Sequence, residues 1–342
     1  MSADPLRTAI RRVAAGESLD AEETTAAFDA VMRGEGSPVQ VAALLMGLRV
    51  KGETAEEVAG GARAMRNAMV HLPVPHPEEL VDTCGTGGGR VTTFNISTAA
   101  ALLAAGMGVR VAKHGNRSFT SSCGSADVLE ALGVRIELPV ERMREVLESA
   151  GIVFMYAPQM HPAMRHVGPV RRELAIPTVM NILGPLANPA GAGRQVVGVA
   201  DEARLPLLAG ALAALGSVHA LVVHGEPGID EISPLGRTRV LEVKGGALGE
   251  WSIDPEEHEL ALAQAAELAG GDPASNAQVI LDVLGGRTRG GARTAVLLNA
   301  AAALYVAGEV DDFDDGMRRA GDALNAGAGL DALDRLRRAT AA

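Results

Sequence analysis

The chain has 342 residues, of which 47% are hydrophobic, 21% are charged and only 2% are aromatic. This length exceeds one ordinary hydrophobic core, so we expect two domains, or one domain with a large appendage. A net charge of −11 without a dense basic block argues against a nucleic-acid partner, because such proteins gain most of their affinity by neutralising phosphates.

The start of the chain, residues 1–5, has neither the basic region nor the apolar region of a secretory signal. Every apolar stretch is interrupted by charged residues, glycine or proline before it reaches transmembrane length. With only two cysteines, Cys84 and Cys123, we expect a reduced, cytoplasmic protein that binds no membrane. We interpret both cysteines as small apolar side chains and not as redox groups or nucleophiles.

Residues 1–70 predict a set of helices, each with its own start signal. The signals are Asp4 with Pro5, Asp20 with Glu23, Ser37 with Pro38 and Gln40, and Thr54 with Glu57. In each, a capping residue is followed by proline or by an acid or amide three positions later. Apolar residues such as Val41, Leu44 and Leu48 then recur at helical spacing, so this part of the chain is expected to be all-helical.

A proline-rich stretch, residues 71–79, marks a domain boundary, because proline can neither continue a helix nor donate to a central strand. Beyond it, strand and helix patterns alternate. We expect strands over 80–84, 109–112, 152–155, 195–199 and 218–223, and helices over 98–105, 126–132, 141–150 and 205–215. This alternation predicts a parallel sheet that is covered by helices on both faces.

A glycine-rich turn, residues 85–89, follows the first predicted strand, and the polar cluster 95–98 precedes the next helix. Glycine allows backbone amides to converge on an anion, and the start of a helix adds donors and partial positive charge. We therefore predict a phosphate-binding loop. It is not a Walker loop, since Gly-Lys-Ser and Gly-Lys-Thr are missing, and it does not match the dinucleotide pattern G-x-G-x-x-G with a suitable acid after it.

A second polar loop follows the strand at 109–112 and runs from Lys113 to Asp127. It contains a lysine, an arginine, an asparagine and several hydroxyl groups. Because the carboxyl ends of neighbouring parallel strands meet at one edge of a sheet, both loops are expected to contribute to one crevice. The alternative is an ordinary solvated polar loop.

Two further groups of residues point to ligands. Asp230 and Glu231 follow the strand at 218–223, and adjacent carboxylates at a strand end suit Mg²⁺; two exposed acids in a turn are the alternative. An arginine among Arg165, Arg171 and Arg172 could form a bidentate pair with a substrate carboxylate, although ordinary charges on a helix surface would give the same pattern. The histidines show no zinc-ligand spacing, and no G-x-S-x-G motif occurs.

The ordered motifs resemble the anthranilate phosphoribosyltransferases, which have the type III phosphoribosyltransferase fold. The resemblance is collinear over nearly the whole chain. It rests on GTGG (85–88), TFNIST (93–98), KHGNRS (113–118), GSADVLEALG (124–133), HPAM (161–164), PVRREL (169–174), NILGPLANP (181–189), DEIS (230–233) and LLNAAAALY (297–305).

The resemblance implies an α/β protein with a small all-helical domain and a large α/β domain, whose mostly parallel central sheet is covered by helices. The helical domain would comprise residues 1–72 plus about 163–190, and the α/β domain residues 73–162 and 191–342. It also implies a homodimer formed through the helical domain, with the active site in the cleft between the domains.

The implied activity is transfer of the 5-phosphoribosyl group from phosphoribosyl pyrophosphate (PRPP) to the amine of anthranilate, with release of pyrophosphate, in tryptophan biosynthesis. Two Mg²⁺ ions per monomer would be held by Ser97, Asp230 and Glu231, and anthranilate would be contacted by Gly85, Asn116, His161 and Arg171. The residues implied to bind PRPP are Gly85, Gly88, Gly89, Thr93, Asn95, Ile96, Ser97, Thr98, Lys113, His114, Gly115, Asn116, Arg117, Ser118, Phe119, Thr120, Ser121 and Ser125.

Positioning and electrostatics would carry this reaction, so no general acid or base is expected. One position departs from the family. Gly89 stands where the family usually has Asp, and Arg90 replaces a common Gly. We expect this change to alter the dependence on Mg²⁺ without abolishing transfer.

Two alternatives come from other classes. A pyrimidine nucleoside phosphorylase shares the architecture and reacts at the same ribose carbon, but it is not expected to show KHGNRS or the Asp230 and Glu231 pair. A paralogue that binds nucleic acid would conflict with the acidic balance of the chain.

Overall fold

The computed structural model describes residues 4–118 and 122–341. Four helices come first: α1 (Pro5–Ala14), α2 (Ala21–Met32), α3 (Pro38–Lys51) and α4 (Ala55–Ala68). The predicted start signals are confirmed. Asp4 accepts backbone hydrogen bonds at the start of α1, and capping boxes led by Asp20, Ser37 and Thr54 begin α2, α3 and α4.

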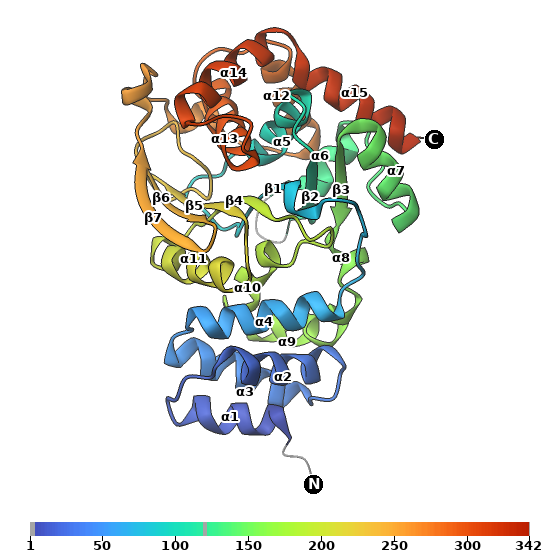
Figure 1. Ribbon diagram of the computed structural model, residues 1–342, viewed down its shortest axis with the longest axis vertical. Helices are drawn as coiled ribbons and strands as arrows, with labels where there is room; N and C mark the ends of the chain where they lie inside the picture. Colours follow the sequence, from blue (N-terminus) through green and yellow to red (C-terminus); the bar gives the residue numbers. More distant parts are fainter. Residues whose placement is uncertain (1–3, 119–121, 342) are drawn as a thin grey trace.

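A seven-stranded sheet lies at the centre of the molecule (Figure 1). Its strands follow the order β3-β2-β1-β4-β5-β6-β7, and the first five are parallel. The strands are β1 (Val81–Gly85), β2 (Val111–Gly115), β3 (Ile152–Tyr156), β4 (Arg194–Gly198), β5 (His219–Gly225), β6 (Thr238–Lys244) and β7 (Ala247–Ile253). The predicted α/β class with a mostly parallel sheet is confirmed.

The sheet has an antiparallel edge that the sequence analysis did not predict. β6 runs antiparallel to β5 and returns as β7 through a tight turn. Gly245 and Gly246 form this turn with φ values of 57° and 83°, the left-handed conformation that two-residue hairpins favour.

Helices cover both faces of the sheet. The remaining helices are α5 (Ile96–Gly106), α6 (Ser125–Ala131), α7 (Val140–Ala150), α8 (Ala157–Met160), α9 (Gly168–Leu174), α10 (Met180–Leu183), α11 (Leu205–Ala214), α12 (Pro273–Leu284), α13 (Gly291–Ala307), α14 (Phe313–Asn325) and α15 (Ala328–Ala341). In Figure 1, α12–α15 lie at one end of the molecule and α1–α4 at the other, with the sheet between them. None of the helices in the described ranges is long and apolar enough to cross a membrane.

Two hydrophobic clusters meet at the sheet, because alternate strand residues point to opposite faces. Val196 and Leu221 belong to the cluster that contains α5, α13 and α15. Their neighbours Val197 and Ala220 belong to the second cluster, which contains α11, the first four helices and buried residues of the segment 167–187. The sheet therefore connects both packing units, and the carboxyl ends of its parallel strands lie together at one edge.

Candidate functional site

The glycine loop begins where β1 ends. Gly85 lies opposite Gly198 of β4, and the segment that carries Asp230 crosses over both glycines. A Cβ atom on Gly85 would collide with the Asp230 carboxylate, and one on Gly198 would collide with the Asp230 backbone carbonyl. These two glycines therefore create the space in which Asp230 lies directly against the strand ends.

Asp230 and Glu231 contact two of the predicted phosphate-binding elements. The amide of Gly87 donates to Asp230 Oδ2 at 2.8 Å, and the amide of Ser97 donates to Glu231 Oε1 at 3.1 Å. Burial raises the pKa of Asp230, and burial together with the neighbouring Asp230 charge raises the pKa of Glu231 to about 8. Two adjacent, half-buried carboxylates are thus costly to ionise together without a cation.

The sequence predicted unpaired backbone amides at the start of α5, but the amides of Ile96, Ser97 and Thr98 already have acceptors within the protein. The amide of Ser97 is taken by Glu231, and those of Ile96 and Thr98 are taken by the carbonyls of Phe94 and Asn95. The side chains of Ile96 and Thr98 are fully buried, so neither is exposed to a ligand. The anion at this helix start is the protein's own carboxylate.

Open donors occur instead in the glycine loop. The amide of Thr86 donates to Gly198 O and that of Gly87 to Asp230. In the part of the chain that the structure describes, no acceptor takes the amides of Gly88 and Gly89, and Gly88 has a φ of 81°. Successive free amides around such a residue form a concave anion-binding surface.

Lys113 is a buried residue of β2, and its side chain extends toward the start of α5. Its Nζ donates to the Thr83 carbonyl and lies 3.3 Å from Ser97 Oγ. Burial lowers the pKa of Lys113, while the carboxylates of Asp82 and Glu231 oppose this shift. The ammonium group is thus close to the carboxylate pair and to the start of α5.

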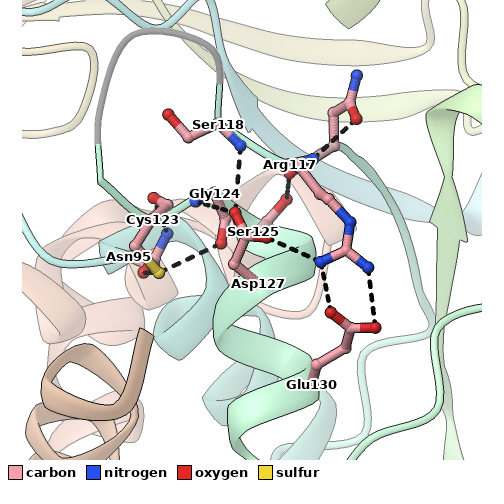
Figure 2. Close-up of polar contacts among 9 residues, drawn as sticks. Asn95, Arg117, Ser118, Cys123, Gly124, Ser125, Asp127 and Glu130 are labelled. Carbon is pink, nitrogen blue, oxygen red and sulfur yellow. Dashed lines mark hydrogen bonds and ion pairs between the residues drawn. The ribbon is translucent and has the colours of Figure 1, made fainter. Parts of the chain in front are cut away.

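The loop after β2 is held by Asp127 of α6 (Figure 2). Its carboxylate accepts the amides of Gly124 at 2.8 Å and Ser118 at 3.2 Å, and an Arg117 hydrogen bond at 2.9 Å. The Arg117 guanidinium also binds Glu130. Its charge is therefore directed to α6 and not to an open crevice.

Asn95 connects the loop to the rest of the fold. Its amide group donates to the Cys123 carbonyl at 3.3 Å, and its Oδ1 accepts hydrogen bonds from the Cys123 thiol and from Asn276. Thr93 forms a backbone bridge with Ala269. The predicted contacts of Phe119, Thr120 and Ser121 lie outside the described residues.

Two of the predicted site residues are buried histidines that face each other. The Nε2 atoms of His114 and His161 lie 3.2 Å apart. Burial lowers the pKa of His114 to about 3 and that of His161 to about 4, so both rings are neutral at physiological pH. Neutral rings supply polar contacts without adding positive charge.

Arg171 is half-buried on α9, and burial lowers its pKa. Within the described ranges its guanidinium has no hydrogen-bond or ion-pair partner. A partly desolvated guanidinium without a counterion suits a carboxylate ligand. Asn116 uses its side-chain oxygen to accept the Arg117 amide at 2.7 Å, which orients the side chain.

A supporting network was not recognised in the sequence. Asp82 is fully buried in β1, accepts the His114 amide at 3.2 Å and accepts Asn188 Nδ2 at 2.8 Å. Burial raises the pKa of Asp82 to about 6. The available signal was an isolated acid inside the apolar strand Leu80-Val81-Asp82, together with Asn188 in the NILGPLANP motif.

Comparisons with known proteins agree with this geometry. The chain matches the family model described as the helical bundle domain of a glycosyl transferase family over residues 7–69, and the model described as its a/b domain over residues 77–330. It is 51% identical over 330 residues to an anthranilate phosphoribosyltransferase from Rubrobacter xylanophilus, with 96% of each chain covered. The chain belongs to the anthranilate phosphoribosyltransferase family.

Solved structures of anthranilate phosphoribosyltransferases have the same fold. The enzyme from Thermus thermophilus has a TM-score of 0.93 and 45% identity, with 99% of this chain and all of that chain covered. The Saccharomyces cerevisiae enzyme, solved in complex with PRPP and Mg, has a TM-score of 0.90 and 26% identity, with 99% of each chain covered. The similarity to the family thus extends over both the helical and the α/β parts.

Proposed function

We infer that this chain transfers the 5-phosphoribosyl group of PRPP to the amine of anthranilate and releases pyrophosphate. The observation that carries the inference is the position of the Asp230 and Glu231 carboxylates, which join the glycine loop to the start of α5. A diphosphate donor with a divalent cation requires acidic ligands and free amides side by side. Family membership of nearly the whole chain supports the same reaction.

The carboxylate pair fits Mg²⁺. Asp230 and Glu231 both have pKa values raised by burial, and Glu231 is raised further by Asp230. A divalent cation would relieve that cost, and oxygen atoms are the ligands it prefers. We propose that Ser97, Asp230 and Glu231 hold Mg²⁺, with two ions in each monomer, and that bound Mg²⁺ supplies Lewis-acid stabilisation of the departing pyrophosphate.

The residues of the chain bind and orient the two substrates. The free amides of Gly88 and Gly89 donate to the diphosphate of the donor, and the buried ammonium group of Lys113 adds a fixed positive charge beside it. Ser118 and Ser125, which follow β2 and begin α6, are proposed to add further contacts to the donor. As the bond from ribose C1 breaks, negative charge grows on the leaving oxygens, and preorganised donors stabilise it.

The acceptor side binds the aromatic acid. We propose that Arg171 pairs with the carboxylate of anthranilate, and that Asn116, Gly85 and the neutral ring of His161 fix the orientation of its ring and amine. An aryl amine is unprotonated near neutral pH, so it can attack C1 without a strong general base. This explains why the site needs no ionised histidine.

We further propose a homodimer formed by the helical domain, comprising residues 1–72 and about 163–190, in a cytoplasmic enzyme of tryptophan biosynthesis. An apolar stripe on α3 supports this interface. Val39 and Val50 have 78% and 80% of their surface exposed, and Ile176 near the end of α9 has 42%. Val39, Ala43, Met46 and Val50 recur at helical spacing and form one face opposite the buried Leu44 and Leu48, on which all but the half-buried Met46 are exposed.

The direct test combines purified protein, Mg²⁺, PRPP and anthranilate, and follows the loss of anthranilate fluorescence. We expect turnover that depends on all four components. Arg171→Gln should raise the KM for anthranilate by about tenfold or more, because a charge-assisted pair is lost. Absence of turnover by the folded protein would overturn the proposed function.

A further inference from the structure

A second cleft opens on the other side of the glycine loop. Its volume is about 570 Å³, which suits a small organic ligand. The residues that line it come from α3, from the segment around α10, from the glycine loop and from the loops after β4 and β5. They include Arg49, Arg90, Arg204, Asp201, Glu202 and His224.

This second cleft is distinct from the proposed donor and acceptor positions. Among the described residues, Ser97, Lys113, Asn116, His161 and Arg171 do not line it. The shared element is the glycine loop. A ligand in the second cleft would thus lie next to bound PRPP, on the opposite side of this loop.

Three arginines line the second cleft in a chain whose net charge is −11. Arg49 comes from α3, Arg90 from the end of the glycine loop and Arg204 from the start of α11. Over the described ranges, the side chains of Arg49 and Arg90 have neither a hydrogen-bond nor an ion-pair partner. Two exposed cations are thus left without counterions at one place.

The third cation is only partly satisfied. The side chain of Arg204 is 12% exposed, and its Nε lies 3.6 Å from Asp201. Its Nη1 atom is buried and has no hydrogen-bond partner in the part of the chain that the structure describes. Buried polar atoms are nearly always paired, so an incompletely paired guanidinium calls for an explanation.

The two acids of the second cleft do not neutralise these cations fully. Glu202 pairs with Arg239 at 3.3 Å, and Asp201 accepts the Ala203 amide while it faces Arg204. His224 donates through Nδ1 to the Val199 carbonyl, 2.7 Å away. The cleft therefore retains an excess of positive charge beside the glycine loop.

We propose that the second cleft binds a small phosphate-bearing molecule other than the PRPP in the donor site. Guanidinium groups bind phosphate oxygens through charge-assisted hydrogen bonds. The occupant contacts α3 and the segment around α10 on one side and the glycine loop on the other. Its binding connects the helical part of the molecule to the donor loop.

Equilibrium dialysis with radiolabelled inorganic phosphate tests the proposal. The donor site is first saturated with PRPP and Mg²⁺ in the absence of anthranilate, so that phosphate bound there is displaced. We expect one saturable phosphate per chain to remain. The variant Arg49→Gln/Arg90→Gln should weaken this phosphate at least about tenfold, because both lost groups form charge-assisted contacts.

The matched control is Arg11→Gln/Arg289→Gln, which removes two exposed arginines away from the second cleft and changes the net charge equally. It should bind phosphate like the unmodified chain. A third variant, Arg49→Gln alone, leaves the glycine loop intact and should still weaken phosphate binding. The proposal is overturned if no phosphate remains bound beside PRPP, or if the Arg49 variants and the control bind it equally. The turnover assay is independent of either result.

Discussion

Two adjacent, half-buried carboxylates beside the glycine loop, Asp230 and Glu231, make the stability of the folded protein depend on pH. Glu231 has a pKa of about 8 in the folded chain against an ordinary value of 4.5, and the pKa of Asp230 is raised as well. The folded state therefore binds protons more tightly than the unfolded state. In the metal-free protein, these groups make the free energy of unfolding fall as pH rises from about 4.5 through about 8.

This fall in the free energy of unfolding with rising pH leads to a prediction for Glu231→Gln. With EDTA at pH 8.5, the variant should melt a few degrees higher than the unmodified chain, because it has no buried charge to ionise. At pH 6 the difference should shrink. Added Mg²⁺ should stabilise the unmodified chain and have little effect on the variant. Melting curves by calorimetry measure both effects, and the exposed Glu137→Gln serves as control. Equal Mg²⁺ responses would contradict the assigned metal site.

Gly89 leads to a second prediction at the residue scale. A Cβ atom at this position would lie 3.2 Å from Gly228 O and 3.5 Å from Asp230 Oδ1. Gly89→Asp therefore places a third carboxylate beside the pair. We expect the Mg²⁺ concentration for half-maximal activity to shift several-fold, because the added charge attracts cations and repels Asp230.

Gly89→Asn is the matched control for this experiment. Asparagine has nearly the same shape as aspartate but no charge, so it should leave the Mg²⁺ titration close to that of the unmodified chain. Identical titrations for Gly89→Asp and the unmodified chain would show that the missing carboxylate has no role in metal dependence.

Among the elements, the loop between β2 and α6 depends most on a single side chain. Asp127 accepts the amides of Gly124 and Ser118 and pairs with Arg117. Asp127→Asn exchanges an acceptor-only group for one that also carries donors, so the loop loses charge-assisted bonds. We expect the KM for PRPP to rise about tenfold with a small change in the KM for anthranilate.

Steady-state kinetics with each substrate varied in turn provides the measurement for Asp127→Asn. Glu130→Gln is the control, since Glu130 binds the Arg117 guanidinium and no loop amide. It should change the KM for PRPP much less. A similar rise in both variants would mean that Arg117, and not the loop backbone, determines donor binding.

Elements governed by local chemistry could be predicted from the sequence. The capping boxes at Ser37 and Thr54 were read from residues three positions apart, and the structure confirms them. The β6–β7 hairpin was missed although Gly245 and Gly246 are a known hairpin signal, because the exposed β7 has no alternating apolar pattern.

Hydrogen bonds in the candidate site between residues far apart in the chain could not be predicted from local sequence patterns. The sequence indicated donors at the start of α5 but not that Glu231, 134 residues away from Ser97, accepts one of them. Likewise, Asp82 and Asn188 are separated by 106 residues and meet only because β1 and the segment after α10 pack together. Sequence predicted which residues gather at the strand ends, whereas their partners follow from tertiary packing.

For the molecule as a whole, the exposed stripe on α3 gives a prediction about assembly. Val39→Glu/Val50→Glu places two charges on the proposed dimer interface and should yield a monomer near 35.1 kDa in sedimentation experiments. Leu248→Glu/Leu262→Glu changes two exposed apolar residues elsewhere and should leave the dimer intact. A dimer that survives the α3 changes would place the interface on another surface.

The edge hairpin has a practical consequence for experiments on the whole molecule. Trp251 on β7 is the single tryptophan of the chain, held by a 3.0 Å hydrogen bond from its indole to Glu242. It borders a neighbouring cavity that shares Glu202, His224, Pro227 and Gly228 with the second cleft. The unlabelled protein thus carries one intrinsic fluorophore at the rim of that region, an optical probe that reads out events there without any engineered tag.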